Sequence, residues 1–126
     1  MTTRRLSLWI AAGLAALASS AAWADGDPEQ GAKVFNKCKA CHVANEEKNR
    51  VGPHLVGIVG RPAASVQDYK YSAAMAESGI VWDEEMLDQY LANPKDVVPG
   101  GKMAFIGLRD EEDREDVIAY LKSAAQ

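Results

Sequence analysis

The spacing of small and apolar residues predicts a helix that begins near Pro28 and runs toward Cys38. Asp27 can cap its N-terminus, and Pro28 fits the first helical position because no hydrogen-bonded N–H is needed there. Gln30 stands where a capping box would return a hydrogen bond to Asp27. One face of this helix carries Gly31, Val34, Phe35 and Cys38.

The same pattern predicts three further helices in the C-terminal half. A short helix spans Ser72–Glu77 and stops near Gly79. Asp83 caps the next helix, and Pro94 ends it. Asp110 caps the last helix, whose first turn is acidic, as the helix dipole favours. The apolar stripes of the two longer helices are Met86, Leu87, Tyr90 and Leu91, and Val117, Ile118, Leu121 and Ala125.

The segments between these helices predict loops and not strands. Residues 43–68 and 93–108 are interrupted by glycine and proline, and residues 52–60 contain too many glycines for a convincing strand. The chain contains no repeats and no internal linkers. We therefore predict one all-α domain in which long loops connect short helices.

The first 24 residues have the pattern of a secretory signal peptide. Arg4 and Arg5 are followed by 19 uncharged residues that end in Ala22-Trp23-Ala24. A basic start, an apolar centre and small terminal residues are typical of a segment cleaved after Ala24, although the apolar length also suits an uncleaved membrane anchor. We expect residues 1–24 to be a cleaved signal peptide and residues 25–126 to form a domain in a bacterial periplasm.

Composition and charge exclude several classes of protein. Of the 126 residues, 48% are hydrophobic and 25% charged, which is too apolar for a disordered chain. Two cysteines cannot staple a disulfide-rich mini-protein. The net charge of −4 becomes −6 without Arg4 and Arg5, so the domain has no basic footprint for nucleic acid.

The sharpest chemical signal is the sequence Cys38-Lys39-Ala40-Cys41-His42, which is the attachment motif of c-type haem. The two thiols can each form a thioether to the porphyrin, and the imidazole can bind its iron. A thioredoxin-like redox pair would need strands around it, and a zinc site that also uses His54 has the wrong spacing. A disulfide between Cys38 and Cys41 is a further, strained alternative. The motif therefore predicts one covalently bound haem c.

The ligand on the other side of the iron decides what this haem can do, because a thioether fills the coordination shell and favours reduced iron. Met75 and Met86 lie in predicted helices, where packing is their default role. His54 follows His42 by only 12 residues, so we expect it on the same side of the haem or on the surface. Met103 lies in a glycine-rich loop that can turn its side chain inward, and it is the preferred candidate.

The order of motifs along residues 25–126 resembles the class I soluble cytochromes c. Besides the cysteine and histidine motif, the resemblance rests on Gly31-x-x-x-Phe35, Gly52-Pro53, Gly60-Arg61, Tyr69-Lys70-Tyr71-Ser72, Gly79-Ile80-Val81-Trp82, Tyr90-Leu91-x-Asn93-Pro94-Lys95, Pro99-Gly100-x-Lys102-Met103 and Ile118-Ala119-Tyr120-Leu121. It implies the cytochrome c fold, with a small helical domain wrapped around one haem that His42 and Met103 ligate.

The resemblance also implies roles for residues around the haem. Pro53 offers its carbonyl to His42, and Tyr90 places its hydroxyl near the sulfur of Met103. The buried propionates are neutralised or hydrogen-bonded by Arg61, Tyr71 and Trp82. In two places the chain departs from the family pattern: Gly101 stands where a threonine is frequent, and Met75 stands where many relatives have asparagine.

These features predict a monomeric one-electron carrier and not an enzyme. It would shuttle electrons from a quinol–cytochrome c reductase or a periplasmic dehydrogenase to an oxidase, a reductase or a photosynthetic reaction centre. The alternative is a haem enzyme or gas sensor with an open iron position. A positive rim around the haem edge is expected to steer redox partners, without stable membrane insertion; it consists of Lys37, Lys39, Lys95 and Lys102.

Overall fold

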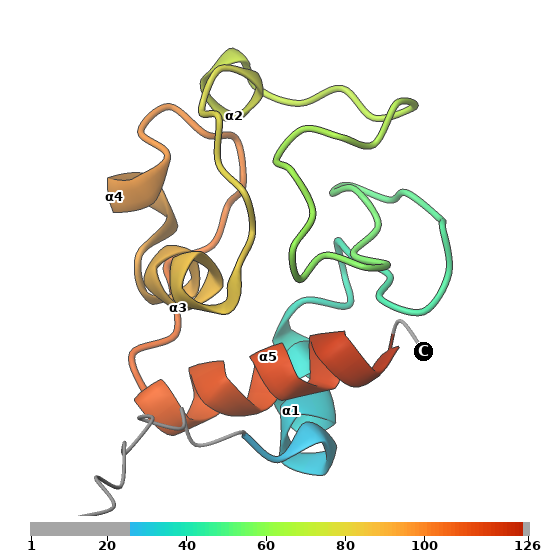
Figure 1. Cartoon of the computed structure of the whole chain (residues 1–126), viewed down its shortest axis with the longest axis vertical. Coiled ribbons are helices and arrows are strands. Elements are labelled where there is room, and N and C mark those ends of the chain that lie inside the picture. The colour runs from blue at the N-terminus through green and yellow to red at the C-terminus, as the bar shows by residue number, and fades with distance from the viewer. Residues whose placement is uncertain (1–25, 125–126) are drawn as a thin grey trace, which may run out of the picture.

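The computed structural model describes residues 26–124, in which short helices are joined by long loops (Figure 1). The helices are α1 (Pro28–Val34), η1 (Phe35–Lys37), α2 (Ala73–Ala76), α3 (Glu84–Ala92), α4 (Pro94–Val97) and α5 (Glu111–Ala124), where η1 is a single 3₁₀ turn. Within this range an isolated bridge between Pro62 and Val81 is the only β-type pairing. The predicted all-α architecture is confirmed. The predicted signal peptide and Ala125 lie outside the described residues.

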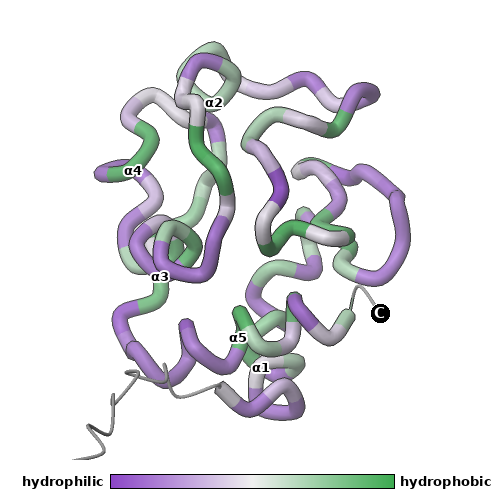
Figure 2. The backbone as a smooth tube through the Cα atoms, in the orientation of Figure 1, coloured by the Kyte–Doolittle hydropathy of each residue, from purple (hydrophilic) through white to green (hydrophobic). Residues whose placement is uncertain are grey.

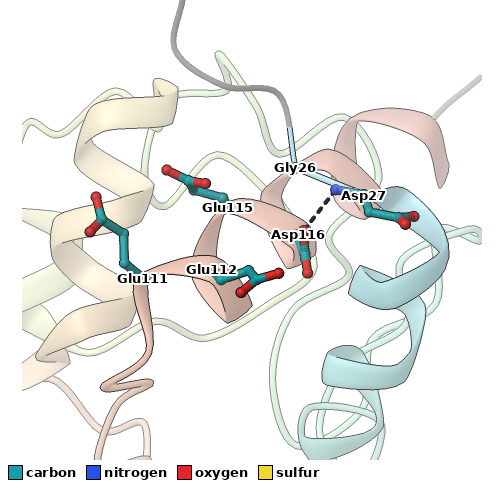
Figure 3. Close-up of a pocket in the computed structure, with 6 residues that line it drawn as sticks. All are labelled: Gly26, Asp27, Glu111, Glu112, Glu115 and Asp116. Carbon is teal, nitrogen blue, oxygen red and sulfur yellow. Dashed lines mark hydrogen bonds between the residues drawn. The ribbon is translucent and has the colours of Figure 1, made fainter.

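The start of α1 is held by two aspartates rather than by a capping box. The side chain of Asp27 accepts hydrogen bonds from the N–H groups of Glu29 and Gln30, at 2.8 and 3.3 Å. The predicted capping-box hydrogen bond between the side chain of Gln30 and Asp27 is wrong, because the Gln30 side chain accepts from Lys33 instead. The N–H of Asp27 donates to Oδ1 of Asp116 at 2.7 Å (Figure 3). A buried carboxylate on α5 is a stronger acceptor than a neutral side-chain amide, so it takes this donor.

Helices α1 and α5 cross at one end of the molecule with their backbones in contact (Figure 1). A Cβ atom on Gly31 would lie 1.9 Å from the carbonyl oxygen of Asp116 and 2.8 Å from Cβ of Tyr120. One turn further on, the rings of Phe35 and Tyr120 meet with their centroids 5.1 Å apart. The first and last helices therefore meet directly, and this contact depends on the missing side chain of Gly31.

The core extends from this crossing to α3 and to the loops. Its buried members are Phe35, Ala44, Ile58, Trp82, Leu87, Leu108, Val117, Ile118 and Leu121. Arg114 of α5 joins α3 through its Nε, 2.7 Å from a carboxylate oxygen of Asp88, and it also donates to the carbonyl of Leu108. The loop of residues 45–50 lies at the outer edge of the molecule and is hydrophilic throughout (Figure 2).

The remaining helices follow the predicted caps closely, with one addition. The side chain of Ser72 caps α2 and that of Asp83 caps α3, by accepting from Met75 and Met86. Pro94 ends α3 as predicted, but it also begins α4, which the sequence analysis assigned to a loop. A proline that stops one helix is pre-shaped for the first position of another, and the extended backbone of Asn93 separates the two.

The crossing predicts that Gly31→Ala destabilises the protein. Helix propensity alone favours alanine over glycine by about 1 kcal/mol, but the new Cβ must push α1 off the backbone of α5. We expect the free energy of unfolding to fall by about 3 kcal/mol in denaturant titrations followed by circular dichroism. As a control, Gly79→Ala adds a methyl into open space at φ +65° and should cost only about 1 kcal/mol. A Gly31→Ala protein as stable as the parent would contradict the close crossing.

Candidate functional site

The cysteine and histidine motif forms a tight turn directly after η1. The N–H groups of Cys41 and His42 both donate to the carbonyl of Cys38, at 3.1 and 2.9 Å. Both cysteines are half-buried, and no disulfide joins them in this structure. Burial, with a smaller contribution from Cys41, raises the pKa of Cys38. The turn thus presents two thiols and an imidazole within five residues.

The imidazole of His42 is fixed by the loop that follows. Its Nδ1 lies 2.7 Å from the carbonyl oxygen of Pro53, which makes Nδ1 the protonated nitrogen and leaves Nε2 free to bind a metal. Burial lowers the pKa of His42, although the hydrogen bond to Pro53 acts in the opposite direction. A Cβ atom on Gly52 would come within 2.3 Å of the imidazole Cε1. Burial thus favours the uncharged ring, and the ring occupies the space that a side chain at position 52 would need.

Sequence analysis missed this steric role of Gly52. The residue was quoted only as part of the Gly52-Pro53 motif, although its position directly before Pro53 was a usable signal. Its N–H donates to the carbonyl of Cys41 at 2.8 Å, which draws the loop against the motif. The same loop is held a second time, where the N–H of Leu55 donates to the carbonyl of Val43.

Met103 is brought together with two aromatic residues of the predicted site. The hydroxyl of Tyr90 on α3 donates to the sulfur of Met103 over 3.9 Å. The ring of Tyr90 in turn packs on buried Trp82, with centroids 4.8 Å apart. Burial raises the pKa of Tyr90, so its hydroxyl keeps its proton and remains a donor. Among the four candidates for the second iron ligand, Met103 is the one that this hydroxyl contacts.

The other three candidates are engaged elsewhere. Met75 and Met86 are half-buried and pack against the hydrophobic core. Nδ1 of His54 accepts from the N–H of Val56 at 3.3 Å, and the carbonyl of His54 accepts from Arg61. His54 therefore serves its own loop rather than a site beside Met103.

Arg61 carries a buried donor that has no partner among residues 26–124. Two of its guanidinium nitrogens donate to the carbonyls of Val56 and His54, both at 3.0 Å, but Nε is buried without an acceptor. Burial lowers the pKa of Arg61, an effect that nearby Tyr71 opposes. The backbone N–H of Trp82 donates to the backbone carbonyl of Arg61. A buried cationic donor without an acceptor is costly, so this position suits an anionic group.

These observations fit the group that the motif predicts. A neutral imidazole with a free nitrogen, a thioether sulfur and two thiols are the donors that covalent haem requires. The unpaired nitrogen of Arg61 fits a propionate. The hydroxyl of Tyr71, which accepts from the N–H of Val66, belongs to the same region. The structure thus provides suitable side chains for the iron, for the thioether links and for the acidic groups of haem.

A separate, acidic pocket lies at the start of α1 and is lined by none of the residues of this site. It lies beside the crossing of α1 and α5 (Figure 3), and it is lined by Gly26, Asp27, Glu111, Glu112, Glu115 and Asp116. Even so, no group of three or more histidine, cysteine or carboxylate side chains in the described part of the chain is arranged to hold a metal ion.

The comparison with known families decides the identity. The family model described as cytochrome c matches residues 28–125. The chain belongs to the cytochrome c family. It is 51% identical over 110 residues to cytochrome c2 of Rhodomicrobium vannielii, which covers 86% of this chain and 88% of that protein. It is 50% identical over 116 residues to cytochrome c-554 of Methylosinus trichosporium, with 90% and 88% covered.

The fold agrees with that of a solved cytochrome. The structure of cytochrome cH from Methylobacterium extorquens matches with a TM-score of 0.74 and 48% sequence identity, covering 78% of this chain and 99% of that one. The predicted fold, the haem c cofactor and the electron-carrier function are therefore confirmed, and the enzyme and sensor alternative is not supported. This cytochrome carries one covalent haem c and exchanges electrons with other redox proteins. Across residues 26–124, no helix has the length and apolar character to cross a membrane.

The contact at Gly52 predicts that Gly52→Ala impairs the haem site. The new methyl would overlap the imidazole of His42, so the ring must turn away and weaken its hydrogen bond to Pro53. We expect less haem per protein by absorbance, and a free energy of unfolding lower by about 2 kcal/mol. Gly57→Ala in the same loop adds a methyl into open space and should keep a full haem content. Equal haem content in both variants would contradict the steric role of Gly52.

Proposed function

We propose that Cys38 and Cys41 would hold the haem by thioether bonds and that Nε2 of His42 and the sulfur of Met103 would bind its iron. When bound, haem c supplies one iron centre that gains and loses a single electron. The observation that carries the proposal is the pair of hydrogen bonds that prepares the two ligands, His42 to Pro53 and Tyr90 to Met103.

The neighbouring residues have separate tasks in this proposal. The carbonyl of Pro53 keeps the proton on Nδ1 of His42, so the opposite nitrogen is always available. The hydroxyl of Tyr90 withdraws charge from the sulfur of Met103 and keeps its side chain turned inward. The propionates are bound by Arg61, Tyr71 and Trp82, where Arg61 has a buried donor to offer. Thioether ligation favours reduced iron and leaves no open position, which suits a carrier of electrons alone.

The proposed location of this carrier is a bacterial periplasm. Residues 1–24 have the composition of a signal peptide cleaved after Ala24, and the cysteine and histidine motif is typical of exported cytochromes. We propose that the donor is a membrane quinol–cytochrome c reductase or a periplasmic dehydrogenase, and that the acceptor is a terminal oxidase, a reductase or a photosynthetic reaction centre. The similarity to bacterial proteins named cytochrome c2 and cytochrome c-550 supports the role of an electron carrier.

The four lysines proposed to guide partners are not equally free to do so. The ammonium of Lys37 lies 3.9 Å from a carboxylate oxygen of Asp113 on α5. The ammonium of Lys102 donates to the carbonyl of Lys70. Lys39 and Lys95 are exposed, and their ammonium groups form no ion pair or hydrogen bond with the described residues. Lys39 lies within the haem-attachment turn, and we propose that it contributes most directly to partner attraction.

The proposed ligation predicts that Met103→Ala changes the iron centre. Without the thioether the oxidised protein should lose the weak long-wavelength absorption band that reports a sulfur–iron bond. The reduction potential should fall, and the reduced protein should bind carbon monoxide. Met75→Leu is the matched control, because Met75 packs against the core and leucine preserves most of its volume. Loss of the band in Met75→Leu but not in Met103→Ala would overturn the assignment.

The charge distribution predicts that Lys39→Gln slows electron exchange with an anionic probe. With hexacyanoferrate at low ionic strength, we expect the second-order rate constant to fall by about twofold, and the difference should vanish at high salt. Lys33→Gln makes the same charge change on α1, where the ammonium already contacts Gln30, and should have a smaller effect. Stopped-flow absorbance measures both. Equal slowing by the two variants would indicate a net-charge effect without a steering rim.

A further inference from the structure

Tyr69 lies between the two segments that carry the proposed iron ligands. Its hydroxyl donates to the carbonyl of Val51 at 2.7 Å. On the other side, the ammonium of Lys102 lies over its ring, 4.5 Å from the ring centroid, and donates to the carbonyl of the next residue, Lys70. One half-buried aromatic side chain is therefore in contact with the loop beside His42 and with the residue that directly precedes Met103.

We propose that Tyr69 and Lys102 form a clamp that positions Met103, with Tyr69 anchored to the His42 loop through its hydroxyl. The proposal rests on the ligation of iron by Met103 given above. Neither residue is a proposed ligand of the iron, so both act as positioning residues.

The segment around Met103 needs such a clamp because its backbone is lightly held. The N–H of Gly101 donates to the carbonyl of Val98, and that of Leu108 donates to the carbonyl of Leu91. Within the described chain, the backbone N–H groups of residues 102–107 donate no hydrogen bond. The fixed points of this segment near Met103 are thus side-chain contacts, of which those of Lys102 and the hydroxyl of Tyr90 are the nearest in sequence and in space.

The loop beside His42, to which the hydroxyl of Tyr69 is anchored, is itself held by several contacts. Val51 precedes Gly52, which abuts the imidazole of His42. The same two segments are tied a second time, where the side-chain amide of Asn49 donates to the carboxylate of Asp68 at 3.0 Å. The ring of Tyr69 is also supported from the side by Tyr71, with centroids 4.9 Å apart in an edge-to-face arrangement. Lys102 therefore contacts an aromatic ring that Val51 and Tyr71 already hold in place.

The strength of the clamp can be measured as the opening of the Met103 segment. Imidazole can bind the oxidised iron only after the sulfur has left, so its apparent affinity scales with the fraction of open molecules. Lys102→Met removes the ammonium and keeps the length of the side chain. We expect it to tighten imidazole binding by about two- to fivefold, as the loss of an exposed cation–π contact implies. Tyr69→Leu should have an effect of similar size.

Three further variants of the haem-loaded protein define the contact. Lys102→Arg keeps a cation over the ring and should bind imidazole within about twofold of the parent. Lys48→Met makes the same charge change at an exposed site in another loop and should leave the affinity unchanged. The double variant Tyr69→Leu with Lys102→Met should tighten imidazole binding by clearly less than the product of the two single effects, because both remove the shared cation–π contact.

The outcomes separate the clamp from the ligation on which it rests. If the parent shows the sulfur–iron band but Lys102→Met and Tyr69→Leu bind imidazole like the parent, the clamp is wrong and the ligation stands. Fully additive effects in the double variant, or an equal effect of Lys48→Met, would also overturn the clamp. If the parent lacks the band, the ligation by Met103 fails, and the clamp fails with it.

Discussion

The hydrogen bond between Nδ1 of His42 and the carbonyl of Pro53 is the interaction on which the rest of this site depends. It decides which imidazole nitrogen is free, and the missing side chain of Gly52 leaves room for the ring in that orientation. Neither constraint comes from the cysteine and histidine motif itself. Both come from a loop ten residues later, which is tied back to the motif through its own backbone hydrogen bonds. The motif supplies the histidine, and the loop orients its imidazole.

The crossing of α1 and α5 fixes the position of the motif, because α1 leads through η1 directly into it. A helix of seven residues such as α1 is too short to be stable alone, so it depends on packing against α5. The missing side chain of Gly31 lets the two backbones touch, and Phe35 continues the contact against Tyr120. Cys38 follows three residues after Phe35. The position of the haem-attachment turn is therefore set by a helix contact that has no chemical function of its own.

Local chemistry explains which parts of the fold the sequence could predict. Capping side chains at Asp27, Ser72 and Asp83 act on neighbours within three residues, so the helix starts were correct. The hydrogen bond from Asp27 to Asp116 spans most of the chain, and nothing local indicated it. Pro94 was interpreted only as a stop, which hid α4. For the site, the motif supplied the cysteines and the histidine, whereas the roles expected beyond them came from family resemblance.

The two proposed ligands are held in physically different ways, and this difference bears on how the cytochrome is tuned. The His42 side is fixed chiefly by the hydrogen bond to the Pro53 carbonyl and by backbone hydrogen bonds of its loop. The Met103 side depends on side chains from other segments, so its strength varies with a few residues. One of the two departures from the family pattern, Gly101, lies two residues before Met103 on this second side. Substitutions on the Met103 side would therefore adjust the proposed iron–sulfur bond, while the hydrogen bond of His42 and the helix crossing stay unchanged.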